Sequence, residues 1–284
     1  MTGVSEQEFL RLVPIFEQVL IKIKLEDTTR INTLGQGIKG HLATTAHKLF
    51  FILFYLKVYP TFDVLGCFFN KGRGRSCEAI HLYTKVLQQA LGRELVLPTR
   101  KVTSMEQLFK DFPEIKDVFI DGVERKVQRP INQKRQKKLY SGKKKIHAKK
   151  NIIVTDEYKK ILFLSTTRSA RRHDKRLADK DSLFEHIPKY IAMWLDTGFQ
   201  GTHKQRGNIC MPKKASKGKP LAKKEKAENK LISAIRVRVE HAIGSVKRFN
   251  ILATTFRNRK PFFDDLVMEL GCGLHNLHLK MGHL

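Results

Sequence analysis

Residues 231–249 carry apolar side chains at steps of three and four positions, which is the period of a helix packed on a core. A second stripe at similar steps is polar, and it places the carboxylate of Glu240 between the cations Arg236 and Lys247 on one face. Solvent-exposed helices often carry such ion pairs without any further role. The pattern alone therefore leaves two interpretations open, a solvated surface and a functional face.

The amino-terminal third has the pattern of several helices. Ser5, followed three residues later by Glu8 and then by an apolar run, predicts a capped helix that ends near Leu20. Three shorter helices are expected farther on, separated by Pro60 and by a Gly- and Arg-bearing turn at 70–75. An apolar helix, a short second helix, a turn and a third helix are typical of a helix-turn-helix module, and an ordinary small helical bundle is the alternative. The three expected helices are residues 47–59, 61–70 and 77–91.

From Leu97 and Pro98 onward the period changes from helical to extended. Asp121 stands near the end of a short apolar strand, and Asp196 lies near the end of a nearly continuous apolar strand, which is typical of a buried position. Two further strands, joined at Asp156, are expected to form an antiparallel hairpin. The expected strands are residues 117–122, 148–156, 159–168 and 190–199, and helices are expected at 174–187 and 261–279.

The charge of the chain indicates its partner. With 55 Lys and Arg against 27 Asp and Glu in 284 residues, the net charge is +28, whereas a magnitude of about 2 to 8 keeps a small domain soluble. An excess of this size favours a polyanion, because each phosphate contact releases condensed counterions. The basic residues concentrate at 134–150, which includes Lys143, Lys144 and Lys145, and at 201–230, which is expected to be a basic loop. Nucleic acid is therefore the expected partner.

The remaining composition argues against two other classes of protein. Four scattered cysteines without CxxC spacing indicate neither a disulfide framework nor a structural zinc site. The polar start of the chain is unlike a signal peptide, and the most apolar run, residues 49–59, is about half a membrane span. A soluble, cytoplasmic protein is expected.

Asp121, Asp196 and Glu240 lie on three separate elements that are expected to pack in the core. Buried carboxylates are costly unless a cation neutralises them. Carboxylate oxygens are ligands that suit Mg²⁺ and Mn²⁺, and two such ions about 4 Å apart activate a nucleophile and stabilise the leaving oxygen at a phosphodiester. Although a lone Asp at a strand end more often caps a turn, three carboxylates in a strongly basic chain favour metal-dependent phosphodiester chemistry.

Four motifs occur in order around these carboxylates. They are Phe-Ile-Asp-Gly at 119–122, Tyr-Ser-Gly-Lys-Lys at 140–144, Leu-Asp-Thr-Gly-Phe-Gln-Gly at 195–201, and Arg-Val-Glu-His-Ala-Ile-Gly at 238–244 followed by Lys-Arg-Phe at 247–249. In this order they resemble the DDE transposases of bacterial insertion sequences, most closely the insertion-sequence-five group. The spacing of Arg236, Glu240 and Lys247 is also similar to that of related transposases.

The resemblance implies a fold class and a division into domains. The fold class is α/β, with an RNase H-like mixed sheet flanked by helices and an N-terminal all-α helix-turn-helix domain. The expected divisions are an N-terminal helical segment at 1–40, the helix-turn-helix domain at 41–96, and the catalytic domain at 97–284 with a basic insertion at about 201–230.

The resemblance also implies an activity and the residues that carry it. Asp121, Asp196 and Glu240 would bind two Mg²⁺ ions, with Mn²⁺ as a substitute, which activate water to cut the transposon ends and then activate the freed 3′-hydroxyl to attack target DNA. The helix-turn-helix would bind terminal inverted repeats of double-stranded DNA, and the enzyme would act in the bacterial nucleoid as a homodimer or a larger assembly. The expected DNA-binding residues are Arg236, Lys247, Arg248, Lys143, Lys144, Lys145, Arg73, Arg75 and Lys85.

Two alternatives remain. A domesticated relative would bind DNA through its helix-turn-helix and regulate without chemistry. A different RNase H-like endonuclease would cut DNA without joining it. Transfer of a 3′-hydroxyl end to target DNA distinguishes a transposase from both.

Overall fold

The computed structural model describes residues 1–27, 40–142, 144–215 and 220–282. Lys143, one of the predicted DNA-binding residues, lies outside the described residues. Residues 216–219 of the expected basic loop also lie outside them. None of the helices in these described ranges has the length and apolar content needed to cross a bilayer.

Contacts divide the chain into two compact units. The helical unit comprises Met1–Leu97, Val246–Thr254 and Asn258–Leu284, and the sheet unit comprises Pro98–Ser245 and Thr255–Arg257. The C-terminal segment therefore packs with the N-terminal helices. The predicted domain boundaries at residues 40, 96 and 97 stay predictions.

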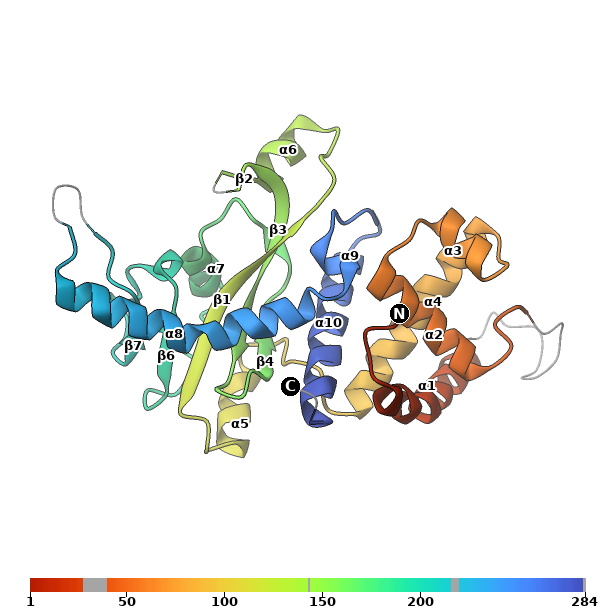
Figure 1. Cartoon of the computed structure of the whole chain (residues 1–284), viewed down its shortest axis with the longest axis horizontal. Coiled ribbons are helices and arrows are strands. Elements are labelled where there is room, and N and C mark those ends of the chain that lie inside the picture. Colours follow the sequence, from red (N-terminus) through yellow and green to blue (C-terminus); the bar gives the residue numbers. More distant parts are fainter. Residues whose placement is uncertain (28–39, 143, 216–219, 283–284) are drawn as a thin grey trace. The chain divides into compact units, whose positions relative to one another are not determined.

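The helical unit contains the helices that the apolar pattern predicts, although α1 continues to Leu25, beyond the predicted end near Leu20. The Ser5 hydroxyl accepts a hydrogen bond from the Glu8 N–H while the Glu8 carboxylate accepts one from the Ser5 N–H, so the predicted capping box is confirmed. α2 ends at Val58, and the next residue, Tyr59, adopts a left-handed conformation before Pro60. The three predicted segments correspond to α2, α3 and α4, but whether they act as a helix-turn-helix module stays a prediction. The helices of this unit (Figure 1) are α1 Glu6–Leu25, α2 Thr45–Val58, α3 Phe62–Phe68, α4 Arg73–Arg93, α9 Asn250–Ala253 and α10 Phe263–Lys280.

The sheet unit is a mixed α/β structure in which helices flank a curled sheet. β1 pairs antiparallel with β3 and parallel with β6, and β6 pairs parallel with β7. The strand order is β2-β3-β1-β6-β7, and β4 and β5 also pair with β3. The predicted antiparallel hairpin is therefore confirmed as β3 and β4. The strands are β1 Asp117–Lys126, β2 Tyr140–Ser141, β3 Ile146–Thr155, β4 Ile161–Leu164, β5 Arg168–Ser169, β6 Ala192–Leu195 and β7 Ile209–Cys210.

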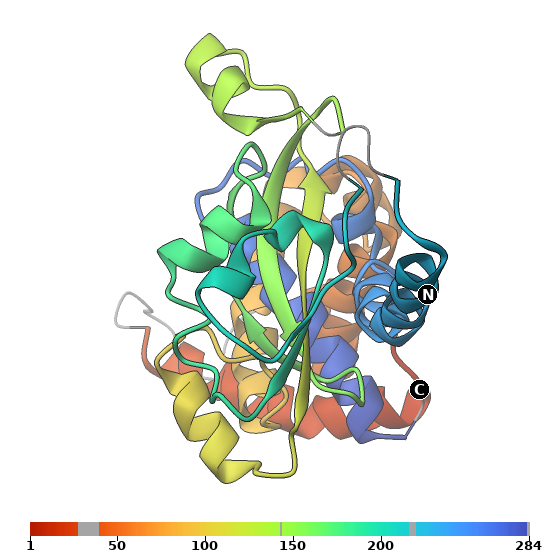
Figure 2. The ribbon, with the colours of Figure 1, turned by 90° about the vertical axis from the view of Figure 1, so that its left-hand side faces the viewer.

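Helices cover both faces of this sheet. α5 and α7 lie on one face, and α8 crosses the other face at β1 (Figures 1 and 2). Because side chains alternate along β1, Ile120 joins the core on the α7 face, whereas Phe119 points to α8 and lies 5.8 Å from the guanidinium of Arg238. The helices of this unit are α5 Ser104–Asp111, α6 Gln133–Leu139, α7 Asp174–Lys180 and α8 Lys223–Val246, with short 3₁₀ turns η1 Thr197–Phe199 and η2 Thr202–Lys204.

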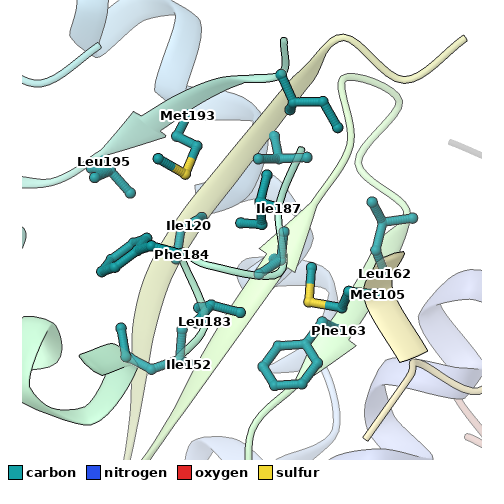
Figure 3. Close-up of a cluster of buried hydrophobic side chains, with 14 of the residues drawn as sticks. Met105, Ile120, Ile152, Leu162, Phe163, Leu183, Phe184, Ile187, Met193 and Leu195 are labelled. Atoms are coloured by element: carbon teal, nitrogen blue, oxygen red, sulfur yellow. The ribbon is translucent and has the colours of Figure 1, made fainter. Parts of the chain in front are cut away.

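The hydrophobic core of the sheet unit lies on the α7 face. Figure 3 shows Ile120 of β1, Ile152 of β3 and Met193 of β6 close to Leu183 and Phe184, and all five side chains are buried. Apolar burial of this kind contributes about 25 cal/mol per Å². The core thereby fixes β1 and β6 side by side.

The strand predicted at 159–168 ends at Leu164 as β4, and two more predicted elements also end earlier than expected. The helix predicted at 174–187 stops at Lys180, because Ser182 adopts a left-handed conformation (φ 50°) and the chain turns Leu183 and Phe184 into the core. The strand predicted at 190–199 is limited to β6, since the chain enters η1 directly after Asp196. Both corrections come from tertiary packing that local periodicity does not contain.

The expected basic loop at 201–230 is partly regular. It contains η2 and β7, and α8 begins within it. The first turns of α8 consist of Lys, Glu and Ala with one Asn, most of which favour helix, and the Glu225 carboxylate accepts a hydrogen bond from the Ala222 N–H at 3.0 Å. The Asn229 side chain also donates to the Lys213 carbonyl and accepts from the Lys213 N–H. The prediction of a loop is therefore wrong for the residues that form these elements.

Candidate functional site

The sheet brings two of the predicted carboxylates to adjacent positions. β1 and β6 are parallel neighbours with Ile120 opposite Leu195, and Asp121 and Asp196 each follow that pair by one residue. Asp121 points to the α8 face because it alternates with Ile120, and Asp196 stands at the start of η1. The Asp121 and Asp196 side chains are 23% and 33% exposed, so both are within reach of solvent and of a ligand.

Arg236 of α8 contacts both carboxylates. Its Nη2 lies 3.8 Å from Asp121 Oδ2, and its Nη1 lies 3.5 Å from Asp196 Oδ1. These distances are long for hydrogen bonds, so the guanidinium offsets part of the negative charge without saturating either carboxylate. The other oxygen of Asp121, Oδ1, accepts a hydrogen bond from the Gly122 N–H at 2.7 Å.

The electrostatic surroundings of Asp121 are unfavourable for its charge. Burial raises the pKa of Asp121 to about 6. The hydrogen bond from Gly122 and the charge of Arg236 act against this rise, whereas the negative charges of Asp196 and Asp174 add to it. Two adjacent carboxylates with too little positive charge around them are an oxygen donor set that suits a divalent cation such as Mg²⁺ or Mn²⁺.

Glu240 lies one helical turn beyond Arg236 on the same face of α8, and its side chain is exposed. Within the described ranges, no three His, Cys, Asp or Glu side chains lie close enough together to hold a metal ion. The structure therefore brings Asp121 and Asp196 together and leaves Glu240 outside such a group. The assignment of all three as a catalytic triad stays a prediction.

A second charged network lies on the α7 face, and periodicity does not reveal it. Lys150 of β3 lies 3.0 Å from the Glu124 carboxylate and 2.8 Å from the Asp174 carboxylate, and Lys144 lies 3.5 Å from Glu124. Burial on its own lowers the pKa of Lys150, but its hydrogen bonds to Asp174 and Glu124 outweigh burial and raise the pKa. Lys150 on β3 is thus charged, and its ion pairs connect β3 to Glu124 of β1 and to Asp174 of α7.

Asp174 also packs against the backbone that carries both site carboxylates. A Cβ atom added at Gly122 would lie 2.4 Å from Asp174 Oδ1, and one added at Gly198 would lie 2.9 Å from Asp174 Oδ2. A larger residue at either position would therefore displace the Asp174 side chain. The sequence signal that points to this network is a glycine one or two residues after each site aspartate.

The predicted DNA-binding residues of the sheet unit are Lys144, Lys145 and Arg236. Lys144 and Lys145 are exposed in the connection between β2 and β3. Arg236 is nearly buried, with 7% of its side chain exposed. Contact of any of them with DNA stays a prediction.

The predicted DNA-binding residues of the helical unit are in two places. The side chains of Arg73, Arg75 and Lys85 are exposed on α4. Lys247 and Arg248 directly follow α8 and are partly buried. Burial lowers the pKa of Arg248, against the opposing charge of Glu8, and its guanidinium lies 5.4 Å from the centre of the Phe249 ring. DNA contact by these residues also stays a prediction.

The chain is similar to known proteins over most of its length. Residues 120–276 match the family described as DDE superfamily endonuclease. Over 282 residues the chain is 29% identical to the probable transposase for insertion sequence element IS702 of Microchaete diplosiphon, and this match covers 99% of the chain and 94% of that relative. No solved structure matches the chain. Asp121, Asp174, Asp196 and Glu240 all lie within the residues that match the family.

Proposed function

Because this chain belongs to the DDE superfamily of endonucleases, we propose that it is the transposase of an insertion sequence, the activity that the name of its 29% identical relative states. It binds the terminal inverted repeats, hydrolyses the phosphodiester at each transposon end and joins the resulting 3′-hydroxyl to target DNA. The observation that supports this most is the adjacency of Asp121 and Asp196 with the guanidinium of Arg236 near both.

The proposed fold assignments follow from the same resemblance. Antiparallel pairing of β1 with β3 and of β3 with β4, parallel pairing of β1 with β6, and a helix across β1 suit an RNase H-like domain. The order of α2, α3 and α4, with exposed arginines at the start of α4, suits a helix-turn-helix that reads the terminal repeats. One active site for each transposon end requires at least a homodimer.

The proposed metal ligands are Asp121, Asp196 and Glu240. When bound, two Mg²⁺ or Mn²⁺ ions supply the activation of the attacking hydroxyl and the stabilisation of the leaving oxygen. The chain itself orients the ligands: the Gly122 N–H holds Asp121 Oδ1, and η1 presents Asp196 directly after β6. Helix α8 carries Glu240 one turn beyond Arg236, so in this proposal Glu240 moves toward the two aspartates when the ions bind.

Arg236 has a separate proposed role. It is nearly buried, and it offsets part of the repulsion between the two aspartates. A guanidinium presents planar donors that suit phosphate oxygens. We therefore expect Arg236 to hold the phosphate at the scissile bond once cations have neutralised the aspartates.

The experiment that tests the proposal uses the full-length protein, Mg²⁺, and DNA that carries the inverted repeats flanking the insertion sequence. We expect the wild type to cleave at the repeat ends and to join the 3′-hydroxyl to a target plasmid. The Asp196→Ala variant should bind the same DNA but neither cleave nor join it. Glu185→Ala removes an exposed carboxylate elsewhere in the sheet unit and should behave as the wild type.

The alternatives have different outcomes in the same experiment. Cleavage without joining supports an endonuclease that only cuts. Binding of the repeats without cleavage by the wild type supports a regulator. Equal cleavage by the wild type and Asp196→Ala contradicts the assignment of the site.

A further inference from the structure

A groove of about 870 Å³ in the sheet unit is lined almost wholly by basic residues. Residues of α6 line one part of it, and Lys149 of β3 together with residues of the segment 167–180, which contains β5 and α7, line the rest. Ten of its fourteen lining residues are Lys or Arg and none is Asp or Glu, so the groove selects for an anion. None of these residues is among the individually predicted DNA-binding residues, although five of the ten cations lie in the basic stretch 134–150.

Contacts within the fold hold the groove in shape. The Ser169 hydroxyl of β5 donates a hydrogen bond to the Lys138 carbonyl at the end of α6. Ser169 is also paired with Lys149 of β3, and Arg168 forms an ion pair with Asp181. Arg168 therefore stabilises the fold. Contacts within the protein hold α6 and β5 in place.

Four exposed cations of the groove have no carboxylate partner in the part of the chain that the structure describes. Among the residues that the structure describes, no Asp or Glu lies within ion-pair distance of Lys137, Arg171, Arg172 or Arg176, and all four side chains are exposed. Like charges gathered around one groove repel each other, and bound phosphates relieve that repulsion. Arginine suits this ligand because its planar donors match two phosphate oxygens at once.

The groove continues toward the candidate active site. A second cavity of about 910 Å³ shares Lys137, Arg171, Arg172 and His173 with the first and extends to Asp174 and Gly198. Gly198 is two residues from Asp196 on the same short turn. Tyr140, which is exposed, also lines the second cavity and offers a ring on which a base can stack. The two cavities therefore form a path that is mostly basic and reaches Gly198, where the carboxylates of Glu124 and Asp174 that also line it are paired with Lys150.

We propose that this groove between α6 and α7 binds the phosphate backbone of DNA next to the bond that is cut. The inference rests on the proposed function, because it takes DNA as the substrate of the adjacent carboxylates. Cations contributed by two separate helices suit a chain of phosphates better than a single phosphate ion, which contacts only a few of them at a time. The groove thus adds a DNA-binding surface to the sheet unit itself.

The test compares the double variant Arg171→Ala/Arg172→Ala with the wild type. Both arginine side chains are exposed, so their loss should leave the fold intact. The matched control Lys110→Ala/Lys116→Ala removes the same charge from two exposed positions outside the groove. Affinity for repeat-end DNA is measured by fluorescence anisotropy from 50 to 300 mM salt, and RNA of the same sequence is a parallel probe.

The expected result is a change in salt dependence. Loss of two phosphate contacts should reduce the slope of log affinity against log salt by about 2 in the groove variant, and the control should keep the wild-type slope. Arg171→Lys/Arg172→Lys should restore most of the slope, because the positive charges remain. A groove variant with the wild-type slope overturns the proposal, as does a reduced slope that is seen with RNA alone.

The two proposals fail separately. If the wild type binds DNA and the groove variant has the reduced slope, but the wild type neither cleaves nor joins DNA, the groove stands and the transposase assignment fails. If the wild type cleaves and joins DNA while the groove variant binds like the wild type, the transposase assignment stands and the groove fails.

Discussion

Two carboxylates, one in each unit, have opposite electrostatic surroundings. Glu94 in the helical unit is 6% exposed, and it accepts hydrogen bonds from Arg11 at 2.9 Å and from Lys280 at 3.0 Å. Burial raises the pKa of Glu94, but these two partners outweigh burial and leave the pKa below its ordinary value. Asp121 in the sheet unit shares the more distant guanidinium of Arg236 with Asp196, and burial raises its pKa to about 6.

The difference is the one expected between a carboxylate that stabilises the fold and one that awaits a ligand. Two cations, Arg11 and Lys280, form short ion pairs with the single carboxylate of Glu94, so its ionised form stabilises the fold. Around Asp121 one cation serves two anions at long range, so the ionised form is less stable than it would be in water. Perturbation of this kind concentrates at functional sites. The number and distance of the cations, more than burial, distinguish the two.

Asp121→Asn should have the largest effect on activity and almost none on stability. Asn has nearly the same size, and its side-chain oxygen still accepts the Gly122 N–H, but it lacks the charge of the proposed metal ligand. We expect the single-turnover rate of cleavage of repeat-end DNA to fall on the order of 10³-fold or more. The unfolding temperature should stay the same or rise, because a partly buried carboxylate whose charge is poorly compensated is removed. Cleavage assays and circular dichroism measure the two quantities.

Glu94→Gln is the control for this experiment. It also removes one carboxylate charge, but from the structural cluster, so it should reduce stability and leave the cleavage rate of the folded protein unchanged. The comparison between the two clusters is wrong if Asp121→Asn loses stability while Glu94→Gln does not.

Gly122→Ala should destabilise the sheet unit through Asp174. The added Cβ would lie 2.4 Å from Asp174 Oδ1, so the carboxylate must move and weaken its 2.8 Å ion pair with Lys150. We expect a loss of about 1–3 kcal/mol in the free energy of unfolding, the usual cost of overpacking. Urea denaturation measures it.

Two further variants sharpen the effect of Gly122→Ala. At Gly207 an added Cβ meets no atom within 4 Å, so Gly207→Ala is the matched control and should change stability little. In an Asp174→Ala background the same methyl group at position 122 has room. Most of the cost of Gly122→Ala should therefore disappear there, and strictly additive losses would show that Asp174 is not the obstacle.

Glu94→Gln should reduce stability in a way that depends on pH. At pH 7 the variant should lose about 1–3 kcal/mol, since hydrogen bonds to a charged group are replaced by weaker ones. The folded pKa of Glu94 is lowered, so its contribution is fully present above the unfolded pKa of roughly 4.3 and is lost as the pH falls through the folded pKa. The stability difference from the wild type, measured by urea denaturation, should therefore shrink from about pH 5 to about pH 3. A constant difference across this range would contradict the role of the charge.

Local patterns predict the elements that carry the site but not the contacts that complete it. The strand at Asp121, the strand before Asp196 and the core of α8 follow from apolar periodicity, and parallel pairing then brings the two aspartates together. The early end of α7 depends on tertiary packing, because Leu183 enters the core. The network around Asp174 also depends on it, because Lys150 pairs with Glu124 and Asp174, which are far apart in the sequence. Periodicity in one segment contains no information about such partners.

The smallest effect on stability should come from Arg73→Ala in the helical unit. Arg73 lies 3.9 Å from Asp63, and their side chains are 73% and 66% exposed. Exposed pairs of this kind contribute no more than about 1 kcal/mol, so the unfolding temperature should hardly change. If α4 reads DNA as predicted, the salt dependence of binding to repeat-end DNA should nevertheless fall by about one unit of slope.

Lys22→Ala breaks a similarly exposed pair with Glu26 at 3.7 Å and removes the same charge, so anisotropy titrations of the two variants separate a specific contact from a general loss of charge. Equal reductions in both would refute a DNA-reading role for the start of α4.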